Sequence, residues 1–218
     1  MKLSGAIFDM DGTLIDSMWI FENYASRYIR SRGMVPAPDL DVRVEKLTLV
    51  ESAAYMASTY HLEGGAERVI RELGSMADAL YDTVEPKPGV LAMLERFRAA
   101  GIPMALATMT ARPTLERVLG RLGILPYLSC IYTCDEVGAL KSSPTIYQEA
   151  LRTLGTKKEE TFVFEDAFYA VRTAVFDGFP TVAVYDESSE CRFDEASALS
   201  VLSIRDYREL DFSALGIL

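Results

Sequence analysis

Short apolar runs alternate with helical patterns along most of the chain. Five of these runs end in polar residues: Gly5–Phe8, Pro103–Ala107, Cys130–Tyr132, Thr161–Phe164 and Thr181–Val184. Between them, apolar residues recur three and four positions apart, which is the spacing of a helix packed on one side. These sets are Leu91, Leu94 and Phe97; Leu115, Val118, Leu119 and Leu122; and Tyr147, Ala150, Leu151 and Leu154. The alternation predicts an α/β fold with a parallel sheet of five strands.

Residues 17–86 show a different pattern. The segments Trp19–Arg30, Val44–Tyr60 and Ala66–Tyr81 have helical periodicity, and no strand-like run separates them. Glycine and proline interrupt the pattern at residues 33–38, 64–65 and 86–89. We therefore expect one α/β core domain, formed by residues 1–16 and 87–218, with an all-helical domain inserted at residues 17–86.

The composition predicts a folded, water-soluble protein, and its charge argues against a polyanionic partner. Half of the 218 residues are hydrophobic and a quarter are charged, as in soluble globular proteins. The net charge of −10, without any Lys/Arg run, argues against nucleic acid as a partner. The same charge repels anionic metabolites, so a phosphate site in this chain needs a local cation or a metal ion.

The chain has no candidate secretion signal or membrane span. The acids after Phe8 interrupt the first apolar run, and no stretch approaches the roughly 20 apolar residues of a span. Cys130, Cys134 and Cys191 cannot all pair and form no metal-binding motif, so we expect reduced, mostly buried thiols. We predict a cytoplasmic protein that contacts no membrane and is a monomer or a weak dimer.

Two acids, Asp9 and Asp11, follow the first apolar run in the string Phe8-Asp9-Met10-Asp11-Gly12-Thr13. Side chains two positions apart at the carboxyl end of a strand can point toward one cleft, where ligands bind in open α/β sheets. Adjacent acids repel each other unless a positive charge lies with them, and Mg²⁺ prefers oxygen ligands. An Asp pair alone is also typical of an acidic turn. A metal site therefore needs support from polar residues elsewhere in the chain.

Three later segments carry polar residues that follow other predicted strands. Thr108 and Met109 follow the second run, just before a helical stretch, where a hydroxyl can donate to phosphate or simply cap the helix. Lys141 is a candidate source of positive charge for a phosphoryl group, although most lysines face solvent. Glu165 and Asp166 close the fourth run, where buried acids require a metal ion or a partner charge.

These motifs together resemble the haloacid dehalogenase superfamily. The string from Phe8 to Ser17 is close to the commonest form of its first motif, and the other three motifs follow in the superfamily's order between residues 3 and 184. The sequence departs from the pattern at Met109, at Leu140 and Ser142 around Lys141, and at Ala167 and Ala170. Sugar-phosphate phosphatases and β-phosphoglucomutase are the most similar subgroup, because they share a helical cap inserted after the first motif.

The resemblance implies a Rossmann-like core with a helical cap, and a role for each motif residue. Asp9 would attack phosphorus to form an aspartyl phosphate, and Asp11 would protonate the leaving oxygen and later activate water. Thr108 and Lys141 would hold the transferring phosphoryl group. Mg²⁺ would be bound by Asp9, by Asp11 through its backbone carbonyl, by Asp166, and by Glu165 directly or through water. Gly12, Met109 and Phe21 are the candidate substrate-binding residues.

We therefore predict a Mg²⁺-dependent phosphatase acting on a small phosphate monoester, such as a sugar phosphate or a related metabolite. The first alternative is a mutase of the β-phosphoglucomutase type, which uses nearly the same groups. That enzyme has a histidine twelve positions after its nucleophile, and this chain has Phe21 there. Phenylalanine forms no conventional hydrogen bond, so we expect phosphate release to dominate.

Three further alternatives fit the sequence less well. The 2-haloacid dehalogenases lack the second acid of the first motif, which is Asp11 in this chain. Phosphonate hydrolases require a cap lysine that forms a Schiff base, and the context of Lys46, the lysine of residues 17–86, does not resemble that motif. A non-catalytic binding protein of this fold usually lacks the nucleophile or a metal acid, and this chain keeps both.

Overall fold

The computed structural model describes residues 1–45 and 47–217, so Lys46 lies outside the described residues. The chain forms two compact units. Met1–Met18 and Val84–Leu218 make up the core unit, and Trp19–Thr83 make up the helical unit. Five residues of the insert expected from the sequence belong to the core unit: Ser17, Met18, Val84, Glu85 and Pro86.

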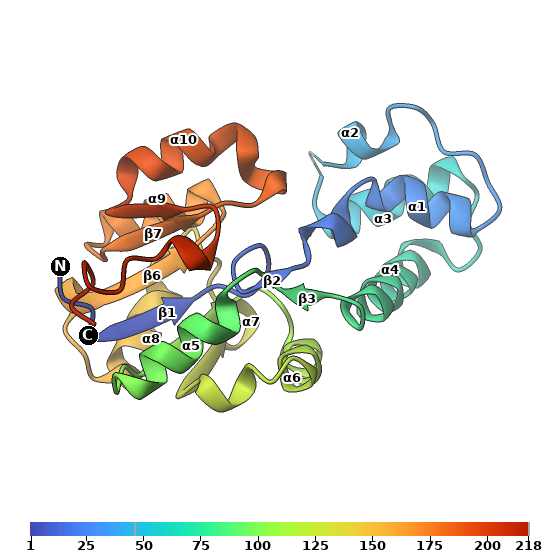
Figure 1. Cartoon of the computed structure of the whole chain (residues 1–218). Helices are drawn as coiled ribbons and strands as arrows, with labels where there is room; N and C mark the ends of the chain where they lie inside the picture. Colours follow the sequence, from blue (N-terminus) through green and yellow to red (C-terminus); the bar gives the residue numbers. More distant parts are fainter. Residues whose placement is uncertain (46, 218) are drawn as a thin grey trace. The chain divides into compact units, whose positions relative to one another are not determined.

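The core unit is built on a parallel sheet with six strands (Figure 1). The strands are β1 (Gly5–Phe8), β4 (Met104–Thr108), β5 (Cys130–Thr133), β6 (Thr161–Glu165), β7 (Thr181–Val184) and β8 (Leu202–Ile204). Their spatial order is β5-β4-β1-β6-β7-β8, and all five pairings are parallel. The prediction of a parallel α/β sheet is confirmed, but the predicted number of five strands is wrong. The missed strand, β8, has three residues and an exposed central serine, so its sequence carries little apolar signal.

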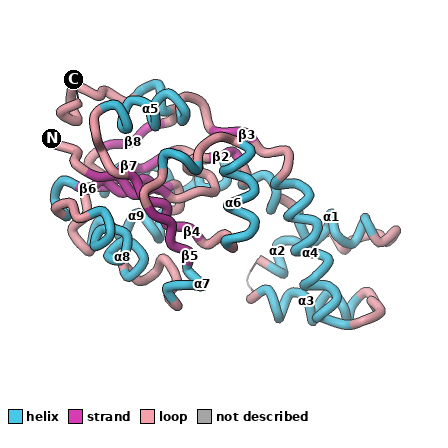
Figure 2. The backbone as a smooth tube through the Cα atoms, turned by 90° about the horizontal axis from the view of Figure 1, so that it is seen from below, coloured by secondary structure: helices cyan, strands magenta, loops and turns pink. Residues whose placement is uncertain are grey.

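Helices cover both faces of this sheet. They are α5 (Val90–Ala99), α6 (Arg112–Arg121), α7 (Cys134–Val137), α8 (Thr145–Leu154), α9 (Phe168–Phe176) and α10 (Glu190–Leu199). Figure 2 shows α5 on one side of the strands and α8 and α9 on the other. From β1 the chain first moves toward β4 and β5 and then returns to β6 on the opposite side of β1. The strand order therefore reverses between β1 and β6, which is where ligands bind in open α/β sheets.

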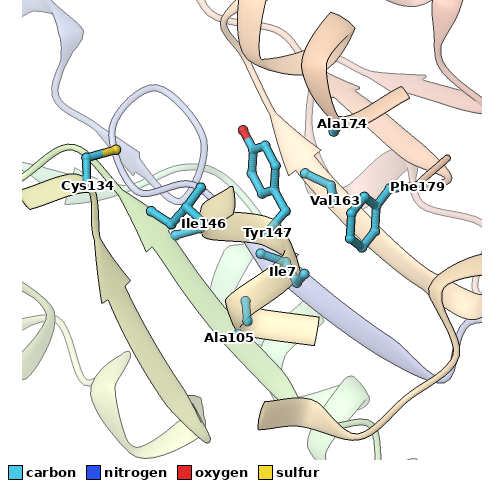
Figure 3. Close-up of a cluster of buried hydrophobic side chains, with 10 residues drawn as sticks. Ile7, Ala105, Cys134, Ile146, Tyr147, Val163, Ala174 and Phe179 are labelled. Carbon is cyan, nitrogen blue, oxygen red and sulfur yellow. The ribbon is translucent and has the colours of Figure 1, made fainter. Parts of the chain in front are cut away.

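Alternating side chains of the central strands form two apolar layers, because successive strand residues point to opposite faces. On one face the rings of Phe8 and Phe164 stack with their centroids 4.6 Å apart, and Phe97 from α5 packs against both. On the other face Ile7 and Val163 lie in a buried cluster with Tyr147 from α8 (Figure 3). The apolar periodicity of the sequence thus marks the residues that each strand and helix buries.

Short helical turns and a two-stranded ribbon complete the core unit. The turns are η2 (Leu125–Tyr127), η3 (Lys158–Glu160), η4 (Glu187–Ser189) and η5 (Tyr207–Glu209). The ribbon pairs β2 (Ile15–Asp16) with β3 (Glu85–Pro86) in antiparallel fashion. The chain leaves the core unit after β2 and returns through β3, so this ribbon holds together the two points where the insert begins and ends.

The helical unit has its own hydrophobic core. It contains α1 (Tyr24–Ser31), α2 (Leu40–Val44), α3 (Leu49–Thr59) and α4 (Gly65–Tyr81). The short turn η1 (Met18–Phe21) begins at Met18, where the first segment of the core unit ends. Buried side chains of all four α-helices form one cluster, with Ile29, Leu40, Ala53 and Val69 among them. The described residues of this unit include no strand, as the sequence predicts.

Two local expectations differ from the structure. The helical pattern over Val44–Tyr60 is split between α2 and α3, because Thr48 begins α3 with a capping box in which its side chain and that of Glu51 bond to each other's backbone N–H. All three cysteines are free, but Cys191 is exposed and only Cys134 is fully buried. Among the described residues, none of the helices combines the length and apolarity that crossing a membrane requires.

Candidate active site

Most of the predicted site residues of the core unit lie at or just after the carboxyl ends of three neighbouring strands, whereas Lys141 lies in the segment between α7 and α8. Phe8 of β1 is level with Phe164 of β6, so the next residues on the two strands are Asp9 and Glu165. The backbone N–H of Asp9 donates to the carbonyl of Phe164 at 3.0 Å, which continues the pairing past the end of β1. Thr108 ends β4 on the other side of β1.

A tight turn follows Asp9 and requires glycine at position 12. Gly12 has φ +74°, in the left-handed region, and its N–H donates to the carbonyl of Ile15 at 3.0 Å. A Cβ at this position would lie 2.5 Å from Oδ2 of Asp166. Thr13 in the same turn donates to the other oxygen, Oδ1 of Asp166, at 3.2 Å. The turn therefore packs directly against the acid at the end of β6, and a side chain at residue 12 would push them apart.

Lys141 connects the acids of the two strands. Its ammonium contacts Oδ1 of Asp9 and donates to Oε1 of Glu165 at 2.8 Å. Burial by itself lowers the pKa of Lys141, but the charges of Asp9 and Glu165 outweigh this effect and raise the pKa above its usual value. Lys141 is therefore a protonated, buried cation in contact with Asp9.

Asp9, Glu165 and Asp166 form a buried acidic cluster. One carboxylate oxygen from each lies within 4.8 Å of the other two. Burial raises the pKa of Asp9 well above its usual value, Lys141 opposes this, and the neighbouring acids add to it. Burial, then Glu165 and Asp186, raise the pKa of Asp166 to about 7. The cluster thus places three carboxyl groups around the ammonium of Lys141, which contacts two of them.

This donor set fits a hard divalent cation. All three side chains offer oxygen atoms, and Oε2 of Glu165 is buried without a hydrogen-bond partner among the described residues. A buried acceptor without a donor is costly, and a cation or its bound water would satisfy it. A positive ion would also oppose the rise in the pKa values of Asp9 and Asp166, which burial causes first and the neighbouring acids increase.

Asp11 is held apart from this cluster by two hydroxyl groups. Ser17 donates to Oδ1 of Asp11 at 2.7 Å, and the hydroxyl of Thr110 bonds to Oδ2. The side chain of Asp11 is thus not a member of the acidic cluster, which fits a proton-transfer role better than direct side-chain ligation. The sequence did not identify Ser17 or Thr110 as partners of Asp11, because only the folded turn brings them to it.

The remaining predicted residues lie at the edge of the site or in the helical unit. Thr108 is fully buried, and its Oγ1 accepts a bond from the backbone N–H of Thr110 at 3.0 Å. Met109 is exposed, and its sulfur accepts a bond from the hydroxyl of Tyr169 at 3.3 Å. Phe21 belongs to the helical unit, where its ring packs edge-on against Tyr24 and Tyr81.

Two features near the acids were not identified from the sequence. Tyr147 is predicted only as an apolar helix position, yet its hydroxyl donates to Oε1 of Glu165 at 2.7 Å. Lys87, just after β3, forms a buried ion pair of 2.8 Å with Asp186, which follows β7. No sequence spacing relates these partners, since each pair joins segments that meet only in the folded sheet.

Comparison with known proteins places this site in a family. Hexitol phosphatase A of Escherichia coli (strain K12) is 28% identical to this chain over 195 residues, which is 89% of each protein. A phosphorylated carbohydrates phosphatase of Thermotoga maritima is 28% identical over 182 residues, covering 83% of this chain and 84% of that protein. Among solved structures, that of a putative β-phosphoglucomutase from Thermotoga maritima matches with a TM-score of 0.83 at 24% identity and covers both chains completely, which shows the shared fold.

A family model matches the part of the chain that carries the predicted site residues of the core unit. The sequence fits the model of the haloacid dehalogenase-like hydrolases over residues 6–184, which include Asp9, Thr108, Lys141 and the two acids after β6. The order of these residues, the parallel sheet that carries them and the helical insert after β2 agree with that match. The chain belongs to the haloacid dehalogenase-like hydrolase family.

Proposed function

We propose that this hydrolase is a Mg²⁺-dependent phosphatase that cleaves small phosphate monoesters, with a sugar phosphate or a related metabolite as substrate. The observation that carries the proposal is the buried contact of Lys141 with both Asp9 and Glu165, next to Asp166. It combines a nucleophile, a cation for the phosphoryl oxygens and a set of metal-binding acids. Two of the relatives are named as a hexitol phosphatase and a phosphorylated carbohydrates phosphatase, and these names support the substrate class.

In the first step a carboxylate oxygen of Asp9 attacks the phosphorus atom, and the bond between phosphorus and the ester oxygen breaks. Asp11 gives its proton to that leaving oxygen, which departs as the alcohol. Lys141 holds the transferring phosphoryl group through its ammonium, and Thr108 holds it through its hydroxyl. Such donors are most effective in a buried site, where they face the charge that develops in the transition state.

In the second step a water molecule attacks the phosphorus atom of the aspartyl phosphate. Asp11, now ionised, takes a proton from this water, and the bond between phosphorus and Asp9 breaks to release inorganic phosphate. The hydroxyls of Ser17 and Thr110 keep the Asp11 carboxyl in one orientation for both proton transfers. Splitting the displacement in two lets one carboxyl group act first as acid and then as base.

The residues that would hold Mg²⁺ are Asp9, Glu165 and Asp166 through their side chains and Asp11 through its backbone carbonyl. When bound, the ion supplies positive charge that offsets the charge of the phosphoryl oxygens. Gly12 and Met109 are proposed to contact the substrate. The helical unit is proposed to act as the cap that selects the ester, with Phe21 as one of its contacts.

The central experiment replaces Asp9 by Asn. The amide keeps the size of the side chain but cannot form the phospho-enzyme, so we expect phosphate release from sugar phosphates to fall to background. Asp194→Asn on α10 is the matched control, because Asp194 is an exposed acid far along the chain from every motif. Phosphate release by Asp9→Asn at the rate of the control would overturn the mechanism.

A second experiment distinguishes the phosphatase from a mutase. The protein is incubated with β-glucose 1-phosphate, Mg²⁺ and a trace of the 1,6-bisphosphate, and glucose 6-phosphate and free phosphate are followed together. We expect free phosphate with little isomerisation, because Phe21 stands where the mutase has a histidine. Near-stoichiometric formation of glucose 6-phosphate would show that the chain is a mutase.

A further inference from the structure

We infer that Tyr147 is a positioning residue that, through its hydroxyl, fixes which oxygen of Glu165 faces the metal position. The inference rests on the proposed function, since it assumes that Glu165 takes part in binding Mg²⁺. It assigns a role to a buried hydroxyl that neither the motif pattern nor the apolar core requires.

The ring of Tyr147 and its hydroxyl have different surroundings. The ring packs in the buried cluster with Ile7, Ala105 and Val163, and contacts Phe179 edge-on with centroids 6.2 Å apart. Figure 3 shows the hydroxyl pointing out of this cluster, away from Ile7 and Ala105. A phenylalanine would fill the same space, so the core explains the ring but not the oxygen.

The hydroxyl of Tyr147 makes one of two bonds to the same carboxylate oxygen. Oε1 of Glu165 accepts from Tyr147 at 2.7 Å and from Lys141 at 2.8 Å, and all three side chains are buried. A carboxylate oxygen has two lone pairs, so these donors occupy Oε1. Oε2 has no hydrogen-bond partner among the described residues and is the oxygen left for a cation or its water.

This arrangement matters because Lys141 has two tasks. Its ammonium carries three N–H donors and contacts both Asp9 and Glu165. In the proposed reaction it must also donate to the oxygens of the phosphoryl group as that group is transferred. When Lys141 shifts toward the substrate, Tyr147 still holds Oε1 of Glu165. Without the tyrosine hydroxyl, Glu165 could rotate with Lys141, and the orientation of the unpartnered Oε2 would no longer be fixed.

The test is to measure Mg²⁺ binding by isothermal titration calorimetry for the wild-type protein, Tyr147→Phe and Tyr132→Phe. Removing a group that orients a metal ligand typically weakens metal binding about 10–100-fold, and we expect this loss for Tyr147→Phe. Tyr132→Phe is the matched control, because it removes a hydroxyl that bonds to Thr153 at 2.6 Å on the exposed side of β5. The control should bind Mg²⁺ like the wild type.

Two further measurements and a second variant separate positioning from packing. The Mg²⁺ concentration that gives half-maximal phosphate release should rise about as much as the dissociation constant, while KM for the ester at saturating Mg²⁺ stays within about twofold. Melting curves without metal show whether Tyr147→Phe is folded. Tyr147→Leu, which also lacks the hydroxyl but keeps an apolar side chain, should show the same weakened Mg²⁺ binding.

Unchanged Mg²⁺ affinity in folded Tyr147→Phe, with a wild-type protein that binds Mg²⁺, would overturn this inference and leave the proposed function standing. A lower melting temperature without any change in Mg²⁺ affinity would likewise reduce Tyr147 to a packing residue. A wild-type protein that binds no Mg²⁺ would overturn the metal-dependent function itself, and the inference with it.

Discussion

At the scale of single residues, Lys141 determines the charge balance of the site. It is a fully buried cation between two carboxylates, and it opposes the rise in the pKa of Asp9 that burial causes. Removing it would favour the protonated, non-nucleophilic form of Asp9 and would remove a donor to the phosphoryl group. Losing such a donor typically costs about 10²–10³ in rate.

We therefore predict that Lys141→Ala lowers kcat for phosphate release by about 10²–10³, whereas Lys157→Ala leaves it unchanged. Lys157 is an exposed lysine just before η3 and serves as the matched control. Melting temperatures of both variants are needed, because breaking a buried ion pair also destabilises the fold. Equal kcat values for the two folded variants would exclude Lys141 from the reaction.

Gly12 is the residue at which backbone conformation and close packing coincide. Its φ of +74° disfavours any side chain, and a Cβ would lie 2.5 Å from Oδ2 of Asp166. We predict that Gly12→Ala displaces Asp166 and weakens Mg²⁺ binding at least as strongly as the loss of an orienting partner, by about 10-fold or more. Calorimetric titration with Mg²⁺ measures the change.

Gly123→Ala is the comparison for that experiment. Gly123 also has a positive φ, of +70°, but a Cβ there would have no heavy atom within 4 Å. It should lose stability from backbone strain and keep its affinity for Mg²⁺. A similar loss of affinity in both variants would mean that backbone strain, and not the contact with Asp166, causes the effect.

At the scale of elements, the buried pair between Lys87 and Asp186 ties two loops at the carboxyl edge of the sheet. Lys87 follows β3, where the chain returns to the core unit, and Asp186 follows β7. The ammonium of Lys87 also donates to the carbonyl of Tyr185, and Asp186 accepts from the backbone and hydroxyl of Ser188. Both side chains are almost completely buried, so either would be left as an unpaired charge without the other.

We predict that Lys87→Met lowers the free energy of unfolding by about 3–5 kcal/mol, the usual cost of breaking a buried pair from one side. Lys2→Met is the control, because Lys2 forms an ion pair with Glu160 but is 72% exposed. Its loss should cost less than about 1 kcal/mol. Urea denaturation of both variants gives the comparison, and equal losses would show that the burial of the Lys87 pair contributes nothing.

At the scale of the whole molecule, the two units have separate hydrophobic cores. The helical unit, Trp19–Thr83, buries its own apolar cluster, and the ribbon of β2 and β3 holds its two connections to the core unit together. Insertions of this kind can be removed when the ends of the insert are close in the host domain.

We predict that replacing residues 19–83 by a short Gly/Ser linker leaves a folded core unit that still binds Mg²⁺. All acids of the cluster and Lys141 remain in that unit. Hydrolysis of sugar phosphates should fall much more than hydrolysis of a small, activated ester such as p-nitrophenyl phosphate, because the cap is proposed to recognise the sugar. Circular dichroism and calorimetry check the fold and the metal site.

The outcome that would contradict this prediction is equal loss of both activities in a folded, Mg²⁺-binding core. The helical unit would then serve the chemical step itself and not the choice of ester. Retention of both activities would show that the helical unit takes no part in catalysis.

The sequence by itself determined the central strands of the sheet and most of the chemical groups of the site. The runs around Ile7, Ala105 and Val163 predicted three central strands, and the polar residue after each run was identified as a candidate for the site. This succeeds because the carboxyl ends of parallel strands share one edge of the sheet, so a residue's place along its strand already gives its location. The acids and Thr108 could be found in this way, whereas Lys141, which lies between α7 and α8, was identified from the resemblance of its neighbouring residues to the family's motif.

Only the tertiary structure decided which of these groups touch and what charge they carry. Asp9 and Asp11 are two positions apart in sequence, yet Asp9 joins Lys141 and the acidic cluster while Asp11 is held by Ser17 and Thr110. Hydrogen bonds and pKa shifts depend on which side chains meet and how deeply they are buried. The hydroxyl of Tyr147 shows this most clearly, because its helical spacing predicts an apolar position and only the packing of α8 on the sheet brings the oxygen to Glu165.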